Sequence, residues 1–259
     1  MILSKNKIQY FRSLSLKKNR DAEGVFIAEG SKLVLDLLPY FELKYLVADL
    51  NWYDQNAKEL AQIIKSGTEC YELSSSDDMK KLSLLTTPAP VFAVFAKRDN
   101  SDISISCLKN ELILALDRVQ DPGNLGTIVR IADWFGIKHI ISAHGTADIY
   151  NPKVVQATMG ALARVSVHYC DLQDVLESLR EEGVEIFGTF LDGDTIYSAD
   201  LPNNGVVVMG NEGSGISSDL EHLFTHRLLI PNFPTGVVTS ESLNVAVATA
   251  IICSEFRRR

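Results

Sequence analysis

The sequence has few cysteines, no long apolar run and no overall positive charge. Its four cysteines lie far apart and no two form a C-x-x-C pair, which indicates reduced thiols and excludes a disulfide framework or a cysteine zinc site. No stretch reaches the roughly 20 apolar residues needed to span a membrane, and residues 1–20 lack the apolar core of a signal peptide. We therefore expect a cytoplasmic protein without membrane contact.

The composition, 46% hydrophobic and 22% charged over 259 residues, is that of a globular chain with one large domain or two modest ones. A net charge of −8 argues against nucleic acid as a partner. However, residues 1–20 contain six basic side chains and no acid, and three arginines close the chain. A polyanion would be attracted to the ends and repelled by the body. The alternative, that these basic ends are simply solvated, stays open.

The hydrophobic pattern predicts two α/β halves with a boundary near residues 98–108. In the first half, 31–41 and 56–67 have helical spacing, whereas 44–50 and 87–98 read as strands. In the second half, near-continuous apolar strands alternate with helices, which is typical of a parallel sheet covered on both faces. The predicted strands are 111–119, 139–144, 165–169, 185–190, 205–210 and 226–231, and the predicted helices are 124–136, 151–163, 172–183, 217–225 and 242–258.

A glycine-rich loop follows one of these strands in VVVMGNEGSGIS, residues 206–217. Its glycine order is the reverse of the dinucleotide-binding G-x-G-x-x-G, and no lysine follows to make a phosphate loop. A simple strand-to-helix turn is the plain alternative. Glu212 favours a functional loop, because it stands between glycines at the carboxyl end of a strand, where α/β proteins bind ligands.

Two other segments have the same layout. LDRVQDPGNLGTIVR, residues 116–130, leads from a strand through a turn into a helix expected to begin near Asn124 or Gly126, with Arg130 one turn in. Helix capping explains the turn but gives no reason for Arg130. Residues 228–250 pass from a strand through Pro231 into a long apolar helix, where Ser240 or Ser242 could cap the helix and Asn244 could lie in its second turn.

Together, these segments resemble the SpoU/TrmH family of RNA 2′-O-ribose methyltransferases in the knotted SPOUT superfamily. The shared blocks are D-x-x-x-D-P-x-N-x-G-x-x-x-R at 117–130, G-x-E-x-x-G at 210–215 and I-P…S-L-N-x-x-x-A ending at Ala248, with a Ser/Thr-x-Gly-Ala helix matched by KVVQATMGAL. Residues 17–38 resemble the small substrate-binding domain of ribosomal RNA members. One departure is the longer loop at 232–241, which borders the expected cofactor pocket.

The resemblance implies an α/β protein with a small L30e-like RNA-binding domain over residues 1–98. A parallel-sheet methyltransferase domain with a deep trefoil knot would span residues 108–259, and the protein would be a homodimer. It implies a catalytic group made of Arg130, Asn124, Glu212, Ser242 and Asn244. S-adenosylmethionine would be held near Thr189, Gly210, Gly215, Ile230 and Leu243. RNA, preferably ribosomal, would contact the basic residues Lys5, Arg12, Lys17, Lys18 and Arg20.

Transfer of a methyl group to a ribose hydroxyl needs a positioned substrate and a route for a proton, but no metal. His222 and His226 lack the glutamate of an H-E-x-x-H zinc site, so we expect no metal. Four alternatives remain: a transfer RNA substrate, a non-catalytic RNA-binding relative, a SPOUT enzyme that methylates a base, and a nicotinamide-dependent oxidoreductase, which the glycine order disfavours.

Overall fold

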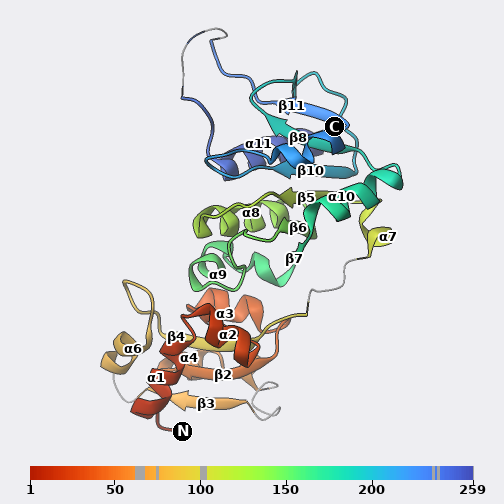
Figure 1. The fold of residues 1–259 in the computed structure, drawn as a ribbon. Coiled ribbons are helices and arrows are strands. Elements are labelled where there is room, and N and C mark those ends of the chain that lie inside the picture. Colours follow the sequence, from red (N-terminus) through yellow and green to blue (C-terminus); the bar gives the residue numbers. More distant parts are fainter. Residues whose placement is uncertain (62–67, 74–75, 100–103, 235–236, 238–239, 259) are drawn as a thin grey trace. The chain divides into compact units, whose positions relative to one another are not determined.

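The computed structural model describes residues 1–61, 68–73, 76–99, 104–234, 237 and 240–258 (Figure 1). Its contacts divide the chain into two compact units. Unit 1 comprises Met1–Arg98 and Asp148–Ala163, and unit 2 comprises Asp99–Ala147 and Arg164–Arg259. The segment 148–163 therefore packs with the N-terminal unit, although it lies within the sequence predicted for the methyltransferase domain. No helix in the described part of the chain is both long and apolar enough to cross a membrane.

Unit 1 contains a mixed four-stranded sheet in the order β1-β4-β2-β3, in which only β2 and β3 are parallel. Its strands are β1 Val25–Glu29, β2 Leu43–Ala48, β3 Glu69–Glu72 and β4 Val91–Ala96. Its helices are α1 Lys5–Ser13, α2 Lys17–Glu23, α3 Ser31–Leu37, α4 Leu50–Gln55, α5 Ala57–Leu60, α6 Ser76–Leu82 and α9 Pro152–Thr158, followed by the short 3-10 helix η2 Ala161–Ala163.

Apolar residues cover both faces of this sheet because its strands are apolar at successive positions. On one face, Ile27 and Val94 join Phe11 of α1 in a buried cluster. On the other face, Phe26 lies against Tyr150, with ring centroids 4.9 Å apart. Burial of this apolar surface is the main stabilising contribution to the unit. Tyr150 packs the 148–163 segment against this core.

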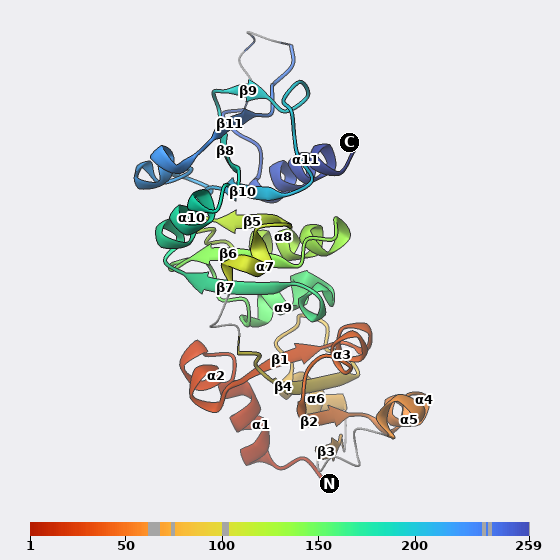
Figure 2. The same cartoon turned by 90° about the vertical axis from the view of Figure 1, so that its right-hand side faces the viewer.

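Unit 2 contains a seven-stranded parallel sheet in the order β7-β6-β5-β10-β8-β11-β9 (Figure 2). Its strands are β5 Leu112–Leu116, β6 His139–Ala143, β7 Ser166–Cys170, β8 Ile186–Phe190, β9 Asp194–Thr195, β10 Gly205–Met209 and β11 His226–Leu229. Its helices are α7 Ile105–Leu108, α8 Pro122–Trp134, α10 Leu172–Glu181, α11 Val245–Arg258 and the 3-10 helix η3 Ser218–Leu223.

The strand order reverses beside β5, because the chain runs from β5 outward to β7 and then returns to build the other half of the sheet. Strands β5 and β10 are neighbours, and the Asp117 N–H just beyond β5 donates to the Met209 carbonyl at the end of β10, at 2.9 Å. In parallel sheets, ligands bind at the carboxyl ends of strands where the order reverses. The fold thus brings the loops after β5 and β10 together at the position favoured for a site.

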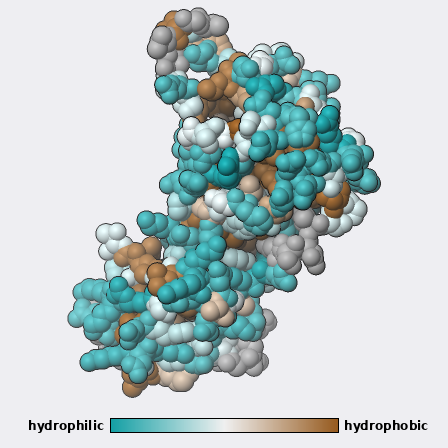
Figure 3. Space-filling model, in the orientation of Figure 1, coloured by the Kyte–Doolittle hydropathy of each residue, from teal (hydrophilic) through white to brown (hydrophobic). Residues whose placement is uncertain are grey.

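Two helix layers cover this sheet. α7, α10 and η3 contribute to a buried cluster with alternate residues of β10, including Val206 and Val208. α8 and α11 pack on each other side by side, and Phe256 of α11 packs against Phe187 of β8. The outer surface drawn in Figure 3 is largely hydrophilic, with separate apolar patches.

The structure confirms the α/β class and differs from the predicted elements at several ends. α8 begins at Pro122, not near Asn124, because Asp121 caps it by accepting from the Asn124 N–H at 2.8 Å; Arg130 consequently lies more than two turns into the helix. The helix predicted over 217–225 is a 3-10 helix that ends at Leu223, so His226 lies on β11. In the helix predicted over 56–67, α5 ends at Leu60, and 62–67 lie outside the described residues.

Candidate active site

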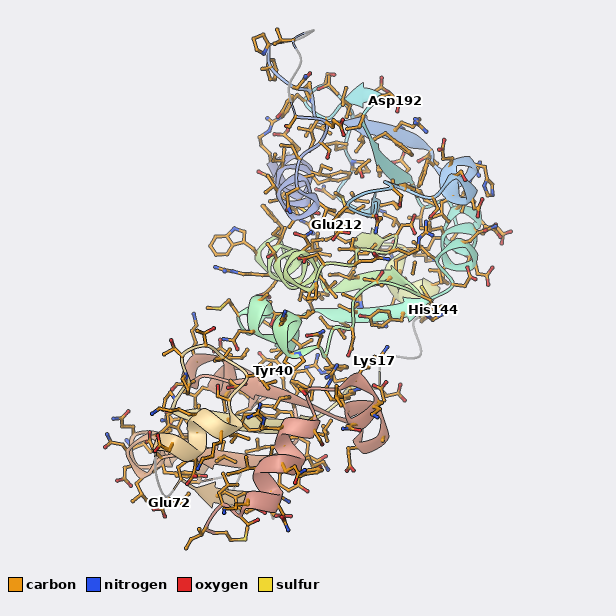
Figure 4. All side chains as sticks on the ribbon, turned by 60° about the vertical axis from the view of Figure 1, so that its left-hand side comes forward. Lys17, Tyr40, Glu72, His144, Asp192 and Glu212 are labelled. Carbon is orange, nitrogen blue, oxygen red and sulfur yellow. The ribbon has the colours of Figure 1, made fainter. Side chains whose placement is uncertain are left out.

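Three segments of unit 2 carry the candidate catalytic residues, and each begins where a strand ends; Asn124 and Arg130 lie on α8, which follows the first of them. Residues 117–121 connect β5 to α8, residues 210–217 connect β10 to η3, and the segment after β11 leads to α11. The three sequence blocks are thus brought to the same carboxyl edge of the sheet. Figure 4 labels Glu212 in this region.

Glu212 holds the first two loops together. Its carboxylate accepts from the Gln120 N–H at 3.2 Å, the Asp121 N–H at 3.1 Å and the Asn124 side-chain amide at 3.0 Å. Partial burial opposes ionisation, but the hydrogen bonds from Asn124 and from backbone N–H groups outweigh it and lower the pKa of Glu212. The residue is therefore a carboxylate at neutral pH, placed where the positive end of the α8 dipole stabilises a negative charge.

Asn124 links this carboxylate to the third block. Its side-chain oxygen accepts from the Asn244 amide at 2.9 Å. Asn244 also caps α11, since its own side-chain oxygen accepts from the Ala246 N–H at 3.0 Å. The expectation that Asn244 lies in the second turn of this helix is therefore wrong: α11 begins at Val245. Glu212, Asn124 and Asn244 form one hydrogen-bonded chain across residues far apart in sequence.

The glycines make the loop 210–217 compact. Asn211 and Gly215 exchange backbone hydrogen bonds at 2.9 and 3.0 Å, and Gly215 has a φ of +70°. A Cβ atom at Gly210 would lie 2.4 Å from the Gly215 carbonyl carbon, so no other residue fits at Gly210 without moving the loop. The closed loop projects Glu212 from its tip.

Arg130 and Ser242 lie outside this hydrogen-bonded chain. Arg130 is exposed on α8, and its side chain makes no hydrogen bond or ion pair with the residues that the structure describes. Ser242 is exposed two residues before Asn244. Both side chains are therefore accessible to a bound substrate.

Of the residues predicted to bind the cofactor, Thr189, Gly210 and Ile230 lie at the ends of β8, β10 and β11, whereas Gly215 lies within the glycine loop and Leu243 lies just before α11. The Thr189 hydroxyl, on β8, donates to the Val208 carbonyl of β10 at 2.9 Å. Gly210 and Gly215 belong to the closed loop, Ile230 follows β11 half-buried, and Leu243 has 48% of its surface exposed. Main-chain groups beside exposed apolar side chains suit the adenine and ribose of S-adenosylmethionine, which need hydrogen bonds and apolar contact. The glycine loop, which has no side chain at Gly210, and the exposed Leu243 are compatible with this cofactor.

The predicted RNA-binding residues in unit 1 divide into two kinds. Lys5, Lys17 and Lys18 are exposed, and Arg12 is exposed while donating to the Lys81 carbonyl at 2.6 Å. Arg20 is 1% exposed. Its guanidinium donates to Asp148 at 2.6 Å and to the carbonyls of Leu14 and Ser15. The structure thus contradicts an RNA contact for Arg20, because the side chain is buried and already bound.

No cluster of three potential metal ligands occurs in the part of the chain that the structure describes. His222 lies 3.9 Å from Glu177, and His226 lies 3.1 Å from Glu185. The two histidines belong to different elements, so their spacing of four in the sequence is not a helical spacing in the fold.

Sequence reasoning gave no separate role to Arg118, Asn211 or Ser217, which hold the loops. The Asn211 amide donates to the Arg118 carbonyl at 2.7 Å, and the Ser217 N–H donates to the buried Asp117 carboxylate at 2.6 Å. The one feature of the sequence that could have indicated a role for this group is the position of Asp117 at the end of a predicted strand.

Comparisons with known proteins agree with this geometry. Residues 111–254 match the SpoU rRNA Methylase family, and residues 5–93 match the MRM3-like substrate binding domain. The chain is 30% identical over 255 residues to the 23S rRNA (guanosine(2553)-2′-O)-methyltransferase RlmP of Bacillus subtilis, covering 97% of this chain and 96% of that protein.

Solved structures also resemble the whole chain, including one from Porphyromonas gingivalis and one from Sinorhizobium meliloti. A protein from Porphyromonas gingivalis assigned to the TrmH family of RNA methyltransferases has 42% identity and a TM-score of 0.86, covering 100% of this chain and 99% of that one. An AdoMet-bound rRNA methyltransferase from Sinorhizobium meliloti has 31% identity and a TM-score of 0.87, covering 99% and 97%.

These similarities confirm the predicted family resemblance, with an N-terminal substrate-binding region followed by a methyltransferase region. They also confirm the predicted activity, that of an RNA methyltransferase that uses S-adenosylmethionine. The trefoil knot is implied by the family. The chain belongs to the SpoU rRNA methylase family.

Proposed function

We propose that this protein transfers a methyl group from S-adenosylmethionine to the 2′-hydroxyl of a guanosine in 23S ribosomal RNA. The observation that carries the proposal is the hydrogen-bonded chain of Glu212, Asn124 and Asn244, which joins all three blocks where the strand order reverses. The Bacillus subtilis relative is a guanosine 2′-O-methyltransferase of 23S rRNA, and this supports the nucleotide and the RNA.

The cofactor would be held by Thr189, Gly210, Gly215, Ile230 and Leu243. When bound, S-adenosylmethionine supplies the methyl group as a sulfonium. The closed glycine loop keeps its backbone near the ligand without an intervening side chain, and Leu243 provides apolar cover for a planar base. The S. meliloti structure, which is AdoMet-bound and similar over the whole chain, supports this cofactor.

Arg130 would orient the ribose and its phosphate. A guanidinium keeps its proton at physiological pH and presents several N–H donors in a plane, which suits phosphate binding better than proton acceptance. The proton of the hydroxyl would leave through water or an adjacent polar group. Ser242 and the linked asparagines would hold the ribose, and Glu212 would keep the α8 end in place.

The RNA would reach the exposed cations of unit 1, Lys5, Arg12, Lys17 and Lys18. Residues 1–98 would then act as the RNA-binding domain and residues 108–259 as the methyltransferase domain. Because the ribose must be accessible, an unpaired or splayed nucleotide is the expected target. A cytoplasmic location would follow from this substrate.

Two copies would pair through the outward face of α8 and α11. These helices run in the same direction: Asn244 bonds to Asn124 near their beginnings, and Arg257 donates to the Phe135 carbonyl at their ends, at 2.9 Å. Trp134, 85% exposed, and Val247, 50% exposed, leave apolar surface on them, which association would bury. The variant Trp134→Ser should sediment as a monomer; a monomeric unmodified protein would contradict the pairing.

The function is tested with purified protein, labelled S-adenosylmethionine and 23S rRNA, with transfer RNA in a parallel reaction. Mass spectrometry of the digested RNA should find one 2′-O-methylguanosine in 23S rRNA. The same position should be unmethylated in cells that lack the gene. Methylation of transfer RNA alone, of a base, or of neither RNA despite cofactor binding would support one of the alternatives instead.

A further inference from the structure

Arg118, the second residue after β5, has a backbone conformation that residues with a side chain rarely adopt. Its φ is +57°, and the other non-glycine residue of positive φ among those described is Met159, in unit 1. The left-handed region is disfavoured for residues with a Cβ atom. Such conformations persist where the surrounding structure holds them, and they concentrate at functional sites.

The Arg118 side chain joins β5 to the far end of the glycine loop. Its Nε donates to Asp117 Oδ1 at 3.0 Å, and its Nη2 donates to the Ser217 hydroxyl. The second oxygen of Asp117 accepts from the Ser217 N–H at 2.6 Å. Asp117 is only 2% exposed, so this buried carboxylate is satisfied by Arg118 and Ser217 together.

The Arg118 backbone holds the near end of the same loop. Its carbonyl accepts from the Asn211 amide at 2.7 Å. Asn211 in turn orders the tip, since its side-chain oxygen accepts from the Gly213 N–H at 2.9 Å and the Ser214 N–H at 3.1 Å. One residue thus contacts both ends of the loop, and Glu212 lies between the two contacts.

We infer that Arg118 is a positioning residue, which fixes the loop 210–217 so that Glu212 meets the beginning of α8 in the geometry needed for methyl transfer. This inference rests on the proposed function of that site. In this role Arg118 acts through the loop that carries Glu212. Loss of its side chain releases Ser217 from one of its two partners and loosens the loop.

Arg118→Gly separates this role from fold stability. Glycine adopts a positive φ without strain, so the variant keeps the backbone conformation and the carbonyl contact and loses the side chain with its guanidinium. Relief of the strain at positive φ offsets part of the cost of leaving the buried Asp117 carboxylate with Ser217 as its remaining side-chain partner, so the melting temperature of the variant should fall by no more than a few degrees. Its kcat should fall about tenfold to a hundredfold, the range expected from a small misplacement of catalytic groups, while KM for RNA stays within about twofold.

Arg118→Lys should recover part of kcat, because an ammonium can still donate to Asp117 or Ser217. The matched control is Lys109→Ala, which removes an exposed cation paired with Glu182 before the start of β5 and should leave kcat unchanged. In a Glu212→Gln background, adding Arg118→Gly should lower kcat by less than a further factor of about two, because both changes act on the carboxylate at position 212. A multiplicative loss, an unchanged kcat, or a raised KM for RNA with kcat unchanged would overturn the inference.

A readout without turnover keeps the two proposals apart. Hydrogen exchange of the Ser217 amide, which donates to Asp117 at 2.6 Å beside the Arg118 guanidinium, should be faster in Arg118→Gly than in the unmodified protein, with exchange in β5 unchanged. If the protein methylates no RNA, the proposed function fails and exchange still tests the loop contact. If exchange is unaltered, the inference fails whether or not the protein is active.

Discussion

Two glutamates, one in each unit, accept backbone N–H groups in opposite surroundings. In unit 1, Glu29 is 5% exposed and accepts from the Leu84 N–H at 2.9 Å and from the Ser83 hydroxyl. Burial raises the pKa of Glu29 although both hydrogen bonds favour the ion. In unit 2, Glu212 is exposed, and its hydrogen bonds overcome burial and lower its pKa.

The difference separates two uses of polar groups. Unit 1 encloses Glu29 and Arg20, so both serve its fold. Unit 2 keeps Glu212 and Arg130 at the surface, where a substrate can reach them. Replacing the enclosed residues should therefore lower the free energy of unfolding, and replacing the exposed residues should lower kcat.

The largest expected effect is that of Arg20→Met on unit 1. The change leaves Asp148 without its 2.6 Å partner, and breaking a buried ion pair on one side costs about 3–5 kcal/mol. Urea denaturation should report a loss of that size, and Arg20→Met with Asp148→Leu should recover much of it. Equal stability of Arg20→Met and the unmodified protein would mean that the pair does not hold the fold.

Arg130→Ala should lower turnover and leave the stability of the protein unchanged. We expect kcat to fall about 10²–10³-fold, the usual cost of losing a positioned donor at a site of reaction, with unchanged stability and unchanged S-adenosylmethionine affinity by calorimetry. Arg180→Ala is the matched control, because Arg180 is an exposed arginine that donates to the His222 carbonyl. Full activity of Arg130→Ala would remove this residue from the site.

The two glutamates should give stability profiles of opposite sign with pH. The contribution of Glu29, whose pKa is raised, is complete below the ordinary carboxyl range and is lost as pH rises through the raised pKa. The contribution of Glu212, whose pKa is lowered, is complete above the ordinary range and is lost as pH falls through the lowered pKa.

Thermal unfolding from acid to neutral pH tests this contrast. The melting temperature of Glu29→Gln should rise relative to that of the unmodified protein as pH increases. The melting temperature of Glu212→Gln should be closest to that of the unmodified protein at the lowest pH. Parallel curves for the two variants would show that the two carboxylates do not differ in this way.

The smallest effect concerns the exposed cations of unit 1. Replacing Lys17 and Lys18 with Gln should weaken RNA binding and reduce the slope of log K against log salt by about 0.7 for each lost phosphate contact. Lys80→Gln is the control, since Lys80 is already paired with Asp77 at 2.9 Å. An unaltered salt slope for the double variant would mean that Lys17 and Lys18 make no phosphate contacts with the RNA.

The sequence was sufficient for the α/β class, the strand pattern and the three blocks, because these depend on local periodicity and on spacing. It was insufficient where long-range contacts decide the outcome. Arg20 reads as part of a basic terminus, yet Asp148, 128 residues away, binds it in the interior. Asn244 reads as a residue within a helix, yet it forms the cap and reaches Asn124.

The histidines at 222 and 226 illustrate the same limit. Their spacing suits a helix, but Phe224 already has the extended conformation that leads into β11. Likewise, nothing local to the sequence reveals that Arg118 adopts a positive φ, because the contacts that hold it come from Ser217 and Asn211, more than ninety residues away.

The closed loop also offers a place to attach a reporter. A Cβ atom at Gly213 would lie 3.7 Å from the Asn211 side-chain oxygen, an ordinary contact, and Gly213 does not have the positive φ of Gly215. A cysteine there, in a background where exposed Cys107 is replaced, would carry a fluorophore next to Glu212. Binding of cofactor and RNA could then be followed in real time at the loop itself.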